Sequence, residues 1–250
     1  MKNLIIIGCG RSGTSALAGM LHNSGYNVGN NYIPLRESNP KGFFEDRTVT
    51  RINDRILFNS YPKKAPFLGC WIMEYKDSNE IGWIVRMALN ARLFSNDKIK
   101  EDIKEIIKNE PFCYKDPRFC YTVPVWKPFL KNTNFICIFR EPSITAASMI
   151  KQRREYLLMK EISLDFSTAV EIWTLMYQHV LEKHSPFDNW LFIHYNQLFT
   201  EKGLDRVDKF LGIKVDRTFI DEKLKRTKSS RFIPEETVEV YKKLCYLAGY

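Results

Sequence analysis

Short apolar runs alternate with longer stretches of helical spacing along this chain of 250 residues, and no other feature constrains its fold as strongly. Four runs are nearly continuous and rich in Ile, Phe and Val, as strands buried on both faces of a parallel sheet are. They are Leu4–Ile7, Phe112–Tyr114, Phe135–Phe139 and Trp190–Ile193. Strands that alternate with helices imply βαβ units. The sequence therefore predicts one α/β domain over residues 1–250, with a central parallel β-sheet flanked by helices.

The stretches between and after these runs have the apolar spacing of helices. We expect helices over Thr14–Asn23, Arg47–Phe58, Ile81–Phe94, Lys98–Lys108, Val123–Leu130, Ile144–Leu158, Phe166–Glu182, Leu204–Leu211 and Glu235–Leu247. Asn30–Asp46 and Tyr61–Leu68 contain Pro, Gly, Asn or charged residues without a sustained period, so both are predicted to be loops.

Composition narrows the class of protein further. No tract reaches the roughly 18 apolar residues of a membrane span, and the first apolar run is too short for a signal peptide. The six cysteines are scattered without a CxxC pair, which favours reduced thiols in a cytoplasmic protein. The net charge of +9 indicates an anionic partner, and a polyphosphorylated small molecule fits. Without a nucleic-acid motif or a membrane segment, we expect neither of those partners.

The segment from Leu4 to Leu17 predicts an anion site. A buried strand enters a glycine-rich turn, and a helix opens directly after it. Backbone N–H groups at a helix start lack intrahelical partners and, with the helix dipole, attract anions. Gly8, Gly10 and Gly13 allow the backbone to turn tightly and to approach such an anion closely.

Three kinds of nucleotide loop share this pattern. A dinucleotide-binding loop needs an acidic residue about 20 residues further on, and residues 27–32 contain no acid. The phosphate loop of NTPases needs a Lys where this chain has Thr14, and Asp116 is the nearest candidate for holding Mg²⁺. A nucleotide or small-molecule kinase using ATP and Mg²⁺ is therefore the alternative. The third loop binds a phosphate-like group without metal, through the Arg11 charge, the Gly13 backbone and nearby hydroxyls.

A second candidate anion site follows the strand Phe135–Phe139. Arg140 ends this strand, Pro142 stands near the start of the next helix, and Ser148 lies about two turns into it. Ligands of open α/β sheets bind beyond the carboxyl ends of the strands. We therefore expect Arg140 and the first loop to face one crevice.

These two motifs together resemble those of sulfotransferases that use 3′-phosphoadenosine 5′-phosphosulfate (PAPS). The residues concerned are Arg11-Ser-Gly-Thr-Ser15 and Arg140-x-Pro142 with Ser148. Three later elements are similar to parts of the same family: Tyr114-Lys115-Asp116-Pro117, as in the tyrosylprotein sulfotransferase branch, Phe192–Leu198 with its Tyr195, and Phe210-Leu211-Gly212. The resemblance covers about residues 4–60 and 112–232 and implies a P-loop-like sulfotransferase fold.

The resemblance also implies roles for individual residues. The 5′-phosphosulfate is expected on Gly10, Arg11, Ser12, Gly13, Thr14 and Ser15. Arg140 and Ser148 are expected to hold the 3′-phosphate, and Tyr195 to line the nucleotide site. The basic run Lys225–Arg231 is similar to a late loop that closes over the nucleotide, although a solvated surface run fits equally well. The product would be adenosine 3′,5′-bisphosphate (PAP), and no metal is expected.

Sulfuryl transfer needs cations near the moving group and a base for the acceptor proton. Lys115 and Arg11 are the candidate cations. Glu45 is the first candidate base, in the loop where the tyrosylprotein branch carries its catalytic glutamate. Glu37 and Asp116 follow it. Alternatively, Glu45 and the adjoining Asp46 only favour the start of the next helix, because acids are stable at helix N-termini.

The acceptor is not readable from the residues, so a small molecule, a carbohydrate and a peptide all stay open. Phe43 and Phe44 flank Glu45 and are possible acceptor contacts. The four histidines do not stand where the cytosolic sulfotransferase branch has its base, so we expect them to be structural. They are His22, His179, His184 and His194.

Overall fold

Four parallel strands form one sheet in the order β2-β1-β3-β4. They are β1 (Asn3–Ile7), β2 (Cys113–Lys115), β3 (Thr133–Phe139) and β4 (Trp190–His194), all within two residues of their expected ends. The computed structural model describes residues 1–250 except 34–36, 38, 61–81, 154–163, 185–186 and 188. The predicted α/β architecture with a central parallel sheet is confirmed.

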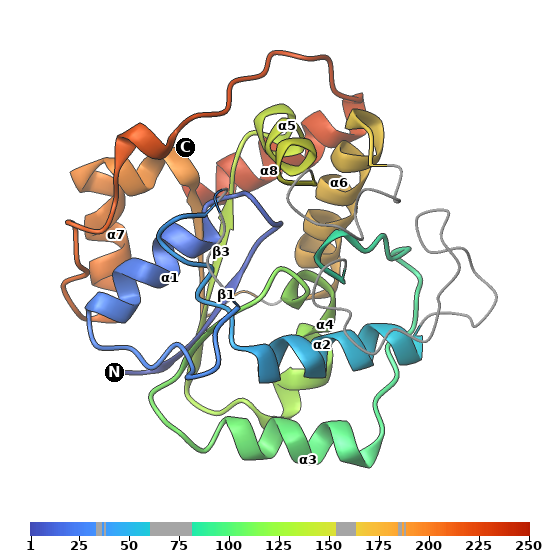
Figure 1. The fold of residues 1–250 in the computed structure, drawn as a ribbon, viewed down its shortest axis with the longest axis vertical. Helices are drawn as coiled ribbons and strands as arrows, with labels where there is room; N and C mark the ends of the chain where they lie inside the picture. Colours follow the sequence, from blue (N-terminus) through green and yellow to red (C-terminus); the bar gives the residue numbers. More distant parts are fainter. Residues whose placement is uncertain (34–36, 38, 61–81, 154–163, 185–186, 188) are drawn as a thin grey trace.

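Helices cover both faces of the sheet, as alternate side chains of the buried strands require. Leu4 and Ile6 of β1 pack with helices α1 (Thr14–Asn23) and α7 (Glu201–Leu211). Ile5 and Ile7 pack on the opposite face with α2 (Arg47–Ser60), α4 (Phe119–Trp126) and α6 (Phe166–Lys183). Figure 1 shows α1 and α7 on one side of β1 and β3, and α2, α4 and α6 on the other.

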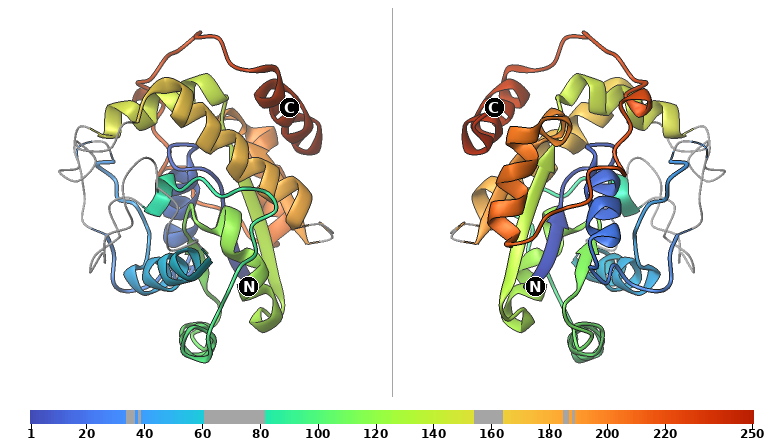
Figure 2. Two further views of the ribbon diagram at one scale, coloured as in Figure 1. Left: turned by 90° about the vertical axis from the view of Figure 1, so that its right-hand side faces the viewer. Right: turned by 90° about the vertical axis from the view of Figure 1, so that its left-hand side faces the viewer.

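The other helices lie around this three-layer core. They are α3 (Asp97–Ile106), α5 (Pro142–Arg153), α8 (Glu235–Ala248) and the 3-10 helices η2 (Gly82–Ile84), η3 (Lys127–Phe129), η5 (Tyr195–Phe199) and η6 (Glu222–Leu224). The chain between α7 and α8 arches over the edge of the sheet from which α5 also starts (Figure 2). The predicted loop Tyr61–Leu68 and the end of the predicted helix Ile144–Leu158 lie outside the described residues.

The prediction of a helix over Ile81–Phe94 was wrong for the described part of that range. Only η2 forms there, and residues 85–94 are irregular. Side chains of other elements occupy the carbonyls that a helix would use: Tyr121 donates to Val85 O at 2.9 Å, and His179 Nε2 lies 3.0 Å from Met87 O. Tertiary contacts have overridden helix propensity in this segment.

The helix expected over Val123–Leu130 begins and ends earlier than predicted. Helix α4 spans Phe119–Trp126, and the 3-10 helix η3 follows it. The earlier start follows Arg118, whose backbone N–H donates to the Asp116 carboxylate at 2.7 Å and so closes the turn between β2 and α4.

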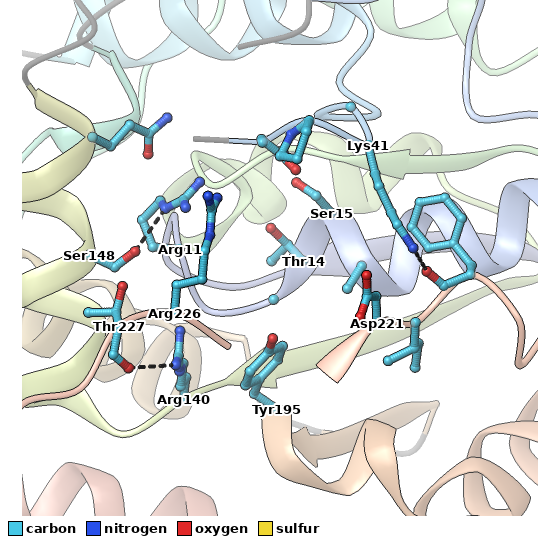
Figure 3. A pocket seen from close by; sticks show the side chains of 18 of the residues that line it. Arg11, Thr14, Ser15, Lys41, Arg140, Ser148, Tyr195, Asp221, Arg226 and Thr227 are labelled. Carbon is cyan, nitrogen blue, oxygen red and sulfur yellow. Dashed lines mark hydrogen bonds between the residues drawn. The ribbon is translucent and has the colours of Figure 1, made fainter. Parts of the chain in front are cut away.

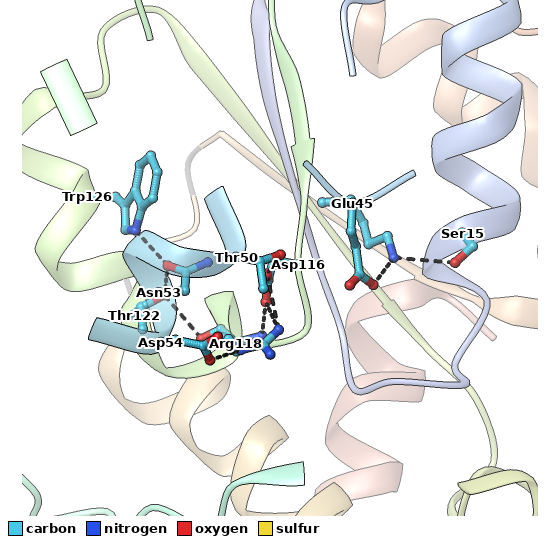
Figure 4. Close-up of polar contacts among 10 residues, drawn as sticks. Ser15, Glu45, Thr50, Asn53, Asp54, Asp116, Arg118, Thr122 and Trp126 are labelled. Atoms are coloured by element: carbon cyan, nitrogen blue, oxygen red, sulfur yellow. Dashed lines mark hydrogen bonds and ion pairs between the residues drawn. The ribbon is translucent and has the colours of Figure 1, made fainter. Parts of the chain in front are cut away.

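A buried ion cluster fixes α2 to that turn. The Arg118 guanidinium, 1% exposed, bonds to Asp54 of α2 at 2.5 Å and to Asp116 at 3.2 Å (Figure 4). Thr50 of α2 donates to the other Asp116 oxygen at 2.9 Å. Charges buried this deeply are stable only while they remain paired. The cluster therefore sets where α2, and the loop before it, lie relative to the sheet.

We expect Asp116→Ala to lower the free energy of unfolding by about 3–5 kcal/mol, because it leaves the Arg118 charge buried with one carboxylate fewer. Urea denaturation measures this loss. The matched control is Asp102→Ala, which breaks the partly exposed pairs with Arg55 and Lys98 and should cost about 1 kcal/mol or less. Equal losses in the two variants would contradict the structural role given to the cluster.

Candidate active site

The turn after β1 has the geometry of an anion loop. Gly8 lies so close to β3 that a Cβ on it would stand 2.2 Å from Ile138 O, so only glycine fits there. Gly13 has φ +96° and precedes α1, and the non-glycine residue Arg11 also has a positive φ of 72°. Successive left- and right-handed residues direct backbone N–H groups into a concavity that suits an anion.

The first and second predicted anion sites line one pocket (Figure 3). Arg11 Nε donates to Ser148 Oγ of α5 at 3.1 Å, so Ser148 contacts the first loop in this structure. The Arg140 guanidinium lies 4.7 Å from the centre of the Tyr195 ring. Gly13, Thr14 and Ser15 line the same pocket. Tyr195 also packs against Gly13, where a Cβ would stand 2.2 Å from its ring. Arg11 and Arg140 thus face a shared cavity.

Basic side chains outnumber acidic ones around this pocket. Among the described lining residues, the basic ones are Arg11, Lys41, Arg140, Lys151 and Arg226, and the acidic ones are Glu37 and Asp221. Sequence reasoning named Arg11 and Arg140 but missed Lys41 and Lys151. Neither of the two stands in a motif, and only the fold brings them to the cavity. The excess of positive charge around the pocket favours an anionic ligand.

Part of the basic run Lys225–Arg231 lies over the pocket. Arg226 and Thr227 line it, and Thr227 O accepts a hydrogen bond from Arg140 Nη2 at 3.4 Å. The Lys225 ammonium lies 3.5 Å from the centre of the Phe199 ring. The run therefore contacts both the second anion site and η5.

A buried ion pair lies next to the loop. Lys115 Nζ, at the end of β2, donates to Glu45 Oε1 and to Ser15 Oγ, the latter at 3.3 Å (Figure 4). Glu45 is 7% and Lys115 2% exposed. Burial raises the pKa of the Glu45 carboxyl above its ordinary value, although the Lys115 ammonium opposes this shift. Ser15 connects the pair to the pocket, because its side chain also lines that cavity.

The two adjacent acids at the start of α2 have different contacts. Asp46 accepts from the backbone N–H groups of Thr48 at 2.7 Å and Asn30 at 3.1 Å, so it caps α2 and fixes the preceding loop. Glu45 bonds instead to Lys115. The alternative in which both acids only start the helix therefore describes Asp46 and not Glu45. Neither Glu45 nor Lys115 is among the described residues that line the pocket, and Ser15 is their contact with it.

The other two candidate bases lie in different surroundings. Asp116 is fully buried, and its carboxylate oxygens are bonded to Arg118 and Thr50. Glu37 is exposed at the rim of the pocket, and its carbonyl accepts from Arg226 at 3.5 Å.

The two candidate acceptor contacts, Phe43 and Phe44, pack against the protein away from the pocket lining. Phe43 is buried, and the Phe44 ring packs against Phe219 and His22 at centroid distances of 5.5 and 5.8 Å. Neither is among the described residues that line the pocket. Three histidines have structural contacts: His179 and His184 bond to backbone carbonyls, and His194 accepts from Asn196 N at 3.2 Å.

Two further observations concern only the described residues. No group of three or more His, Cys, Asp and Glu side chains there could hold a metal ion. The same part of the chain contains no helix long and apolar enough to cross a membrane.

Comparison with known proteins agrees with this geometry. A search of curated proteins found no match. The sulfotransferase domain from the olefin synthase of Synechococcus PCC 7002 is 13% identical, with 98% of this chain and 96% of that chain covered at a TM-score of 0.53. The sulfotransferase domain from the curacin biosynthetic pathway is 14% identical, with 97% of each chain covered at a TM-score of 0.57. Both show the same P-loop-like fold.

The family model described as the sulfotransferase family matches residues 3–217, which is most of the chain. The anion loop, Lys115, Arg140 and Tyr195 all fall inside this range. The chain belongs to the sulfotransferase family.

Proposed function

We propose that this protein transfers a sulfuryl group from PAPS to an acceptor hydroxyl or amine. The observation that carries the proposal is the shared pocket in which Arg11 and Arg140 meet. PAPS carries anionic groups at both the 5′ and the 3′ position of its ribose, so it needs two cation sites at the ends of one cavity. A ligand with a single phosphate would leave one of these two arginines without an anionic partner.

The residues around the pocket suit the two ends of such a nucleotide. At the 5′ end, Arg11 supplies a charge, Thr14 and Ser15 supply hydroxyls, and the start of α1 after Gly13 supplies backbone N–H groups. Gly10 and Ser12, the other predicted members of this site, are not among the described residues that line the pocket. Arg140 is held over the Tyr195 ring, where a cation is favourable, and we assign it to the 3′-phosphate. Ser148 lies between the two sites through its bond to Arg11, so we assign it to positioning Arg11 as well as to phosphate binding.

Transfer breaks the bond between sulfur and the bridging oxygen of the 5′-phosphate and forms one between sulfur and the acceptor oxygen or nitrogen. Arg11 and Lys115 stabilise the charge that develops on the departing phosphate and on the sulfuryl oxygens. Glu45 removes the acceptor proton as the new bond forms. Its burial suits this role, because a carboxylate with a raised pKa is a stronger base than an exposed one.

We expect the protein to bind PAP without a metal ion. PAP at 100 times its dissociation constant should stabilise the protein by about 2.7 kcal/mol and raise Tm by roughly 5–10 °C in buffer containing EDTA. Differential scanning fluorimetry measures the shift. Arg140→Ala should largely abolish it at the same concentration, whereas Lys100→Ala, on the exposed face of α3, should keep it. A shift that appears only with ATP and Mg²⁺ would refute the donor assignment.

We expect turnover to require the Glu45 carboxylate. Glu45→Gln should lower kcat by about 10²–10⁴-fold, because the proton acceptor is lost while the amide still accepts a hydrogen bond from Lys115. PAP affinity, measured by calorimetry, should change little. Glu37→Gln, at the rim of the pocket, is the matched control and should retain turnover. Normal turnover in Glu45→Gln would show that another group is the base.

The pH dependence of kcat/KM should follow the ionisation of the Glu45 carboxyl. Glu45 acts as a base only when ionised, so kcat/KM should fall as the pH is lowered through its pKa. Because burial raises that pKa, the fall should occur at a higher pH than for an ordinary glutamate. Rate profiles over acidic to neutral pH measure the midpoint. A midpoint at or below the ordinary glutamate value would contradict this role.

A further inference from the structure

A buried tyrosine of α6 connects the two anion sites through their backbones. The Tyr177 hydroxyl donates to Ile138 O at 2.8 Å and accepts from Cys9 N at 3.1 Å. Ile138 lies two residues before Arg140, and Cys9 lies two residues before Arg11. Tyr177 is fully buried, and this burial raises the pKa of its hydroxyl well above the ordinary value, so the proton that it donates is retained.

The two hydrogen bonds of the Tyr177 hydroxyl lie just beyond the point where direct pairing between β1 and β3 stops. The last Cα pair in register is Ile7 with Cys137, and the chain then turns into the loop. A Cys9 N–H left without Tyr177 would be a buried donor that has lost its partner. The phenol therefore replaces a strand-to-strand hydrogen bond and fixes the distance between the loop and the end of β3.

A second side chain on the same helix face extends this contact. Trp173, one turn before Tyr177, donates through Nε1 to Arg140 O at 3.1 Å, and the two rings lie 4.6 Å apart. Side chains four residues apart lie on one face of a helix, so α6 presents both donors to the carboxyl edge of the sheet. One rigid helix thus contacts the backbone of both anion sites.

The loop needs such support because Arg11 has an unfavourable backbone. A non-glycine residue with φ of 72° is strained and persists only when its surroundings determine it. Tyr177 restrains the chain two residues before Arg11, and Ser148 restrains the Arg11 side chain. Relaxation of this turn would move the guanidinium relative to Arg140.

We propose that Tyr177, together with Trp173, is a positioning residue that sets the separation of the two anion sites for a ligand bound at both. Neither side chain is among the described residues that line the pocket, so both act through the backbone of Cys9, Ile138 and Arg140. The nature of the ligand rests on the proposed function, whereas the effect on the loop does not.

The test compares Tyr177→Phe with Tyr114→Phe. Tyr114 is also a buried phenol that donates to a backbone carbonyl, Ile106 O at 2.8 Å, but this carbonyl belongs to α3. Both variants should lose stability. Only Tyr177→Phe should bind PAP about tenfold more weakly, measured by calorimetry well below the Tm of each variant. Only it should speed amide exchange in peptides covering residues 8–13 of the ligand-free protein.

The two readouts separate the proposals. Unchanged exchange in Tyr177→Phe would overturn the positioning role, and so would unchanged PAP affinity where the wild type binds PAP. A wild type that fails to bind PAP would defeat the proposed donor, and exchange alone would then decide the role of Tyr177. Where Tyr177→Phe fails to fold, Trp173→Phe is compared with Trp126→Phe, whose buried indole donates to Asn53 instead. Equal exchange and affinity in that second pair would likewise overturn the proposal.

Discussion

The site depends on how closely the first loop approaches the end of β3. Gly8 leaves no room for a Cβ beside Ile138 O, and this contact places the turn after β1 directly beside the strand that carries Arg140. Because the sheet is parallel, both turns open at the same edge. The neighbouring order of β1 and β3 therefore determines that Arg11 and Arg140 share one cavity.

The buried acids of this region differ in their partners: Asp116, Asp54 and Asp46 support the fold, and Glu45 is the base that we propose. Asp116 and Asp54 neutralise the Arg118 guanidinium, and Asp46 caps α2. Glu45 is paired with a lysine that also contacts the anion loop. The ion cluster holds α2 and, with it, the loop that carries Glu45, so the structural acids position the candidate base.

Sequence reasoning reached the strands, the anion loop and Arg140 because each depends on local pattern: continuous apolar runs, glycine spacing, and an Arg at a strand end. It failed for residues 82–94, where Tyr121 and His179 hold the backbone carbonyls of an irregular segment, since contacts between distant residues leave no local period. For the same reason it missed Lys41, and it ranked Asp116 as a possible base without seeing Arg118 beside it. It selected Glu45 by position; the structure pairs this residue with Lys115, and its role as the base stays a prediction.

The central claim is that one ligand spans both anion sites. The most direct test is calorimetry in metal-free buffer. It compares the binding of PAP, AMP and adenosine 3′-phosphate to the wild type, Arg11→Ala and Arg140→Ala. The account predicts that PAP binds most tightly to the wild type, that Arg140→Ala removes the advantage of PAP over AMP, and that Arg11→Ala removes its advantage over adenosine 3′-phosphate. Equal affinity of the wild type for all three nucleotides, or equal losses for all three in each variant, would contradict it.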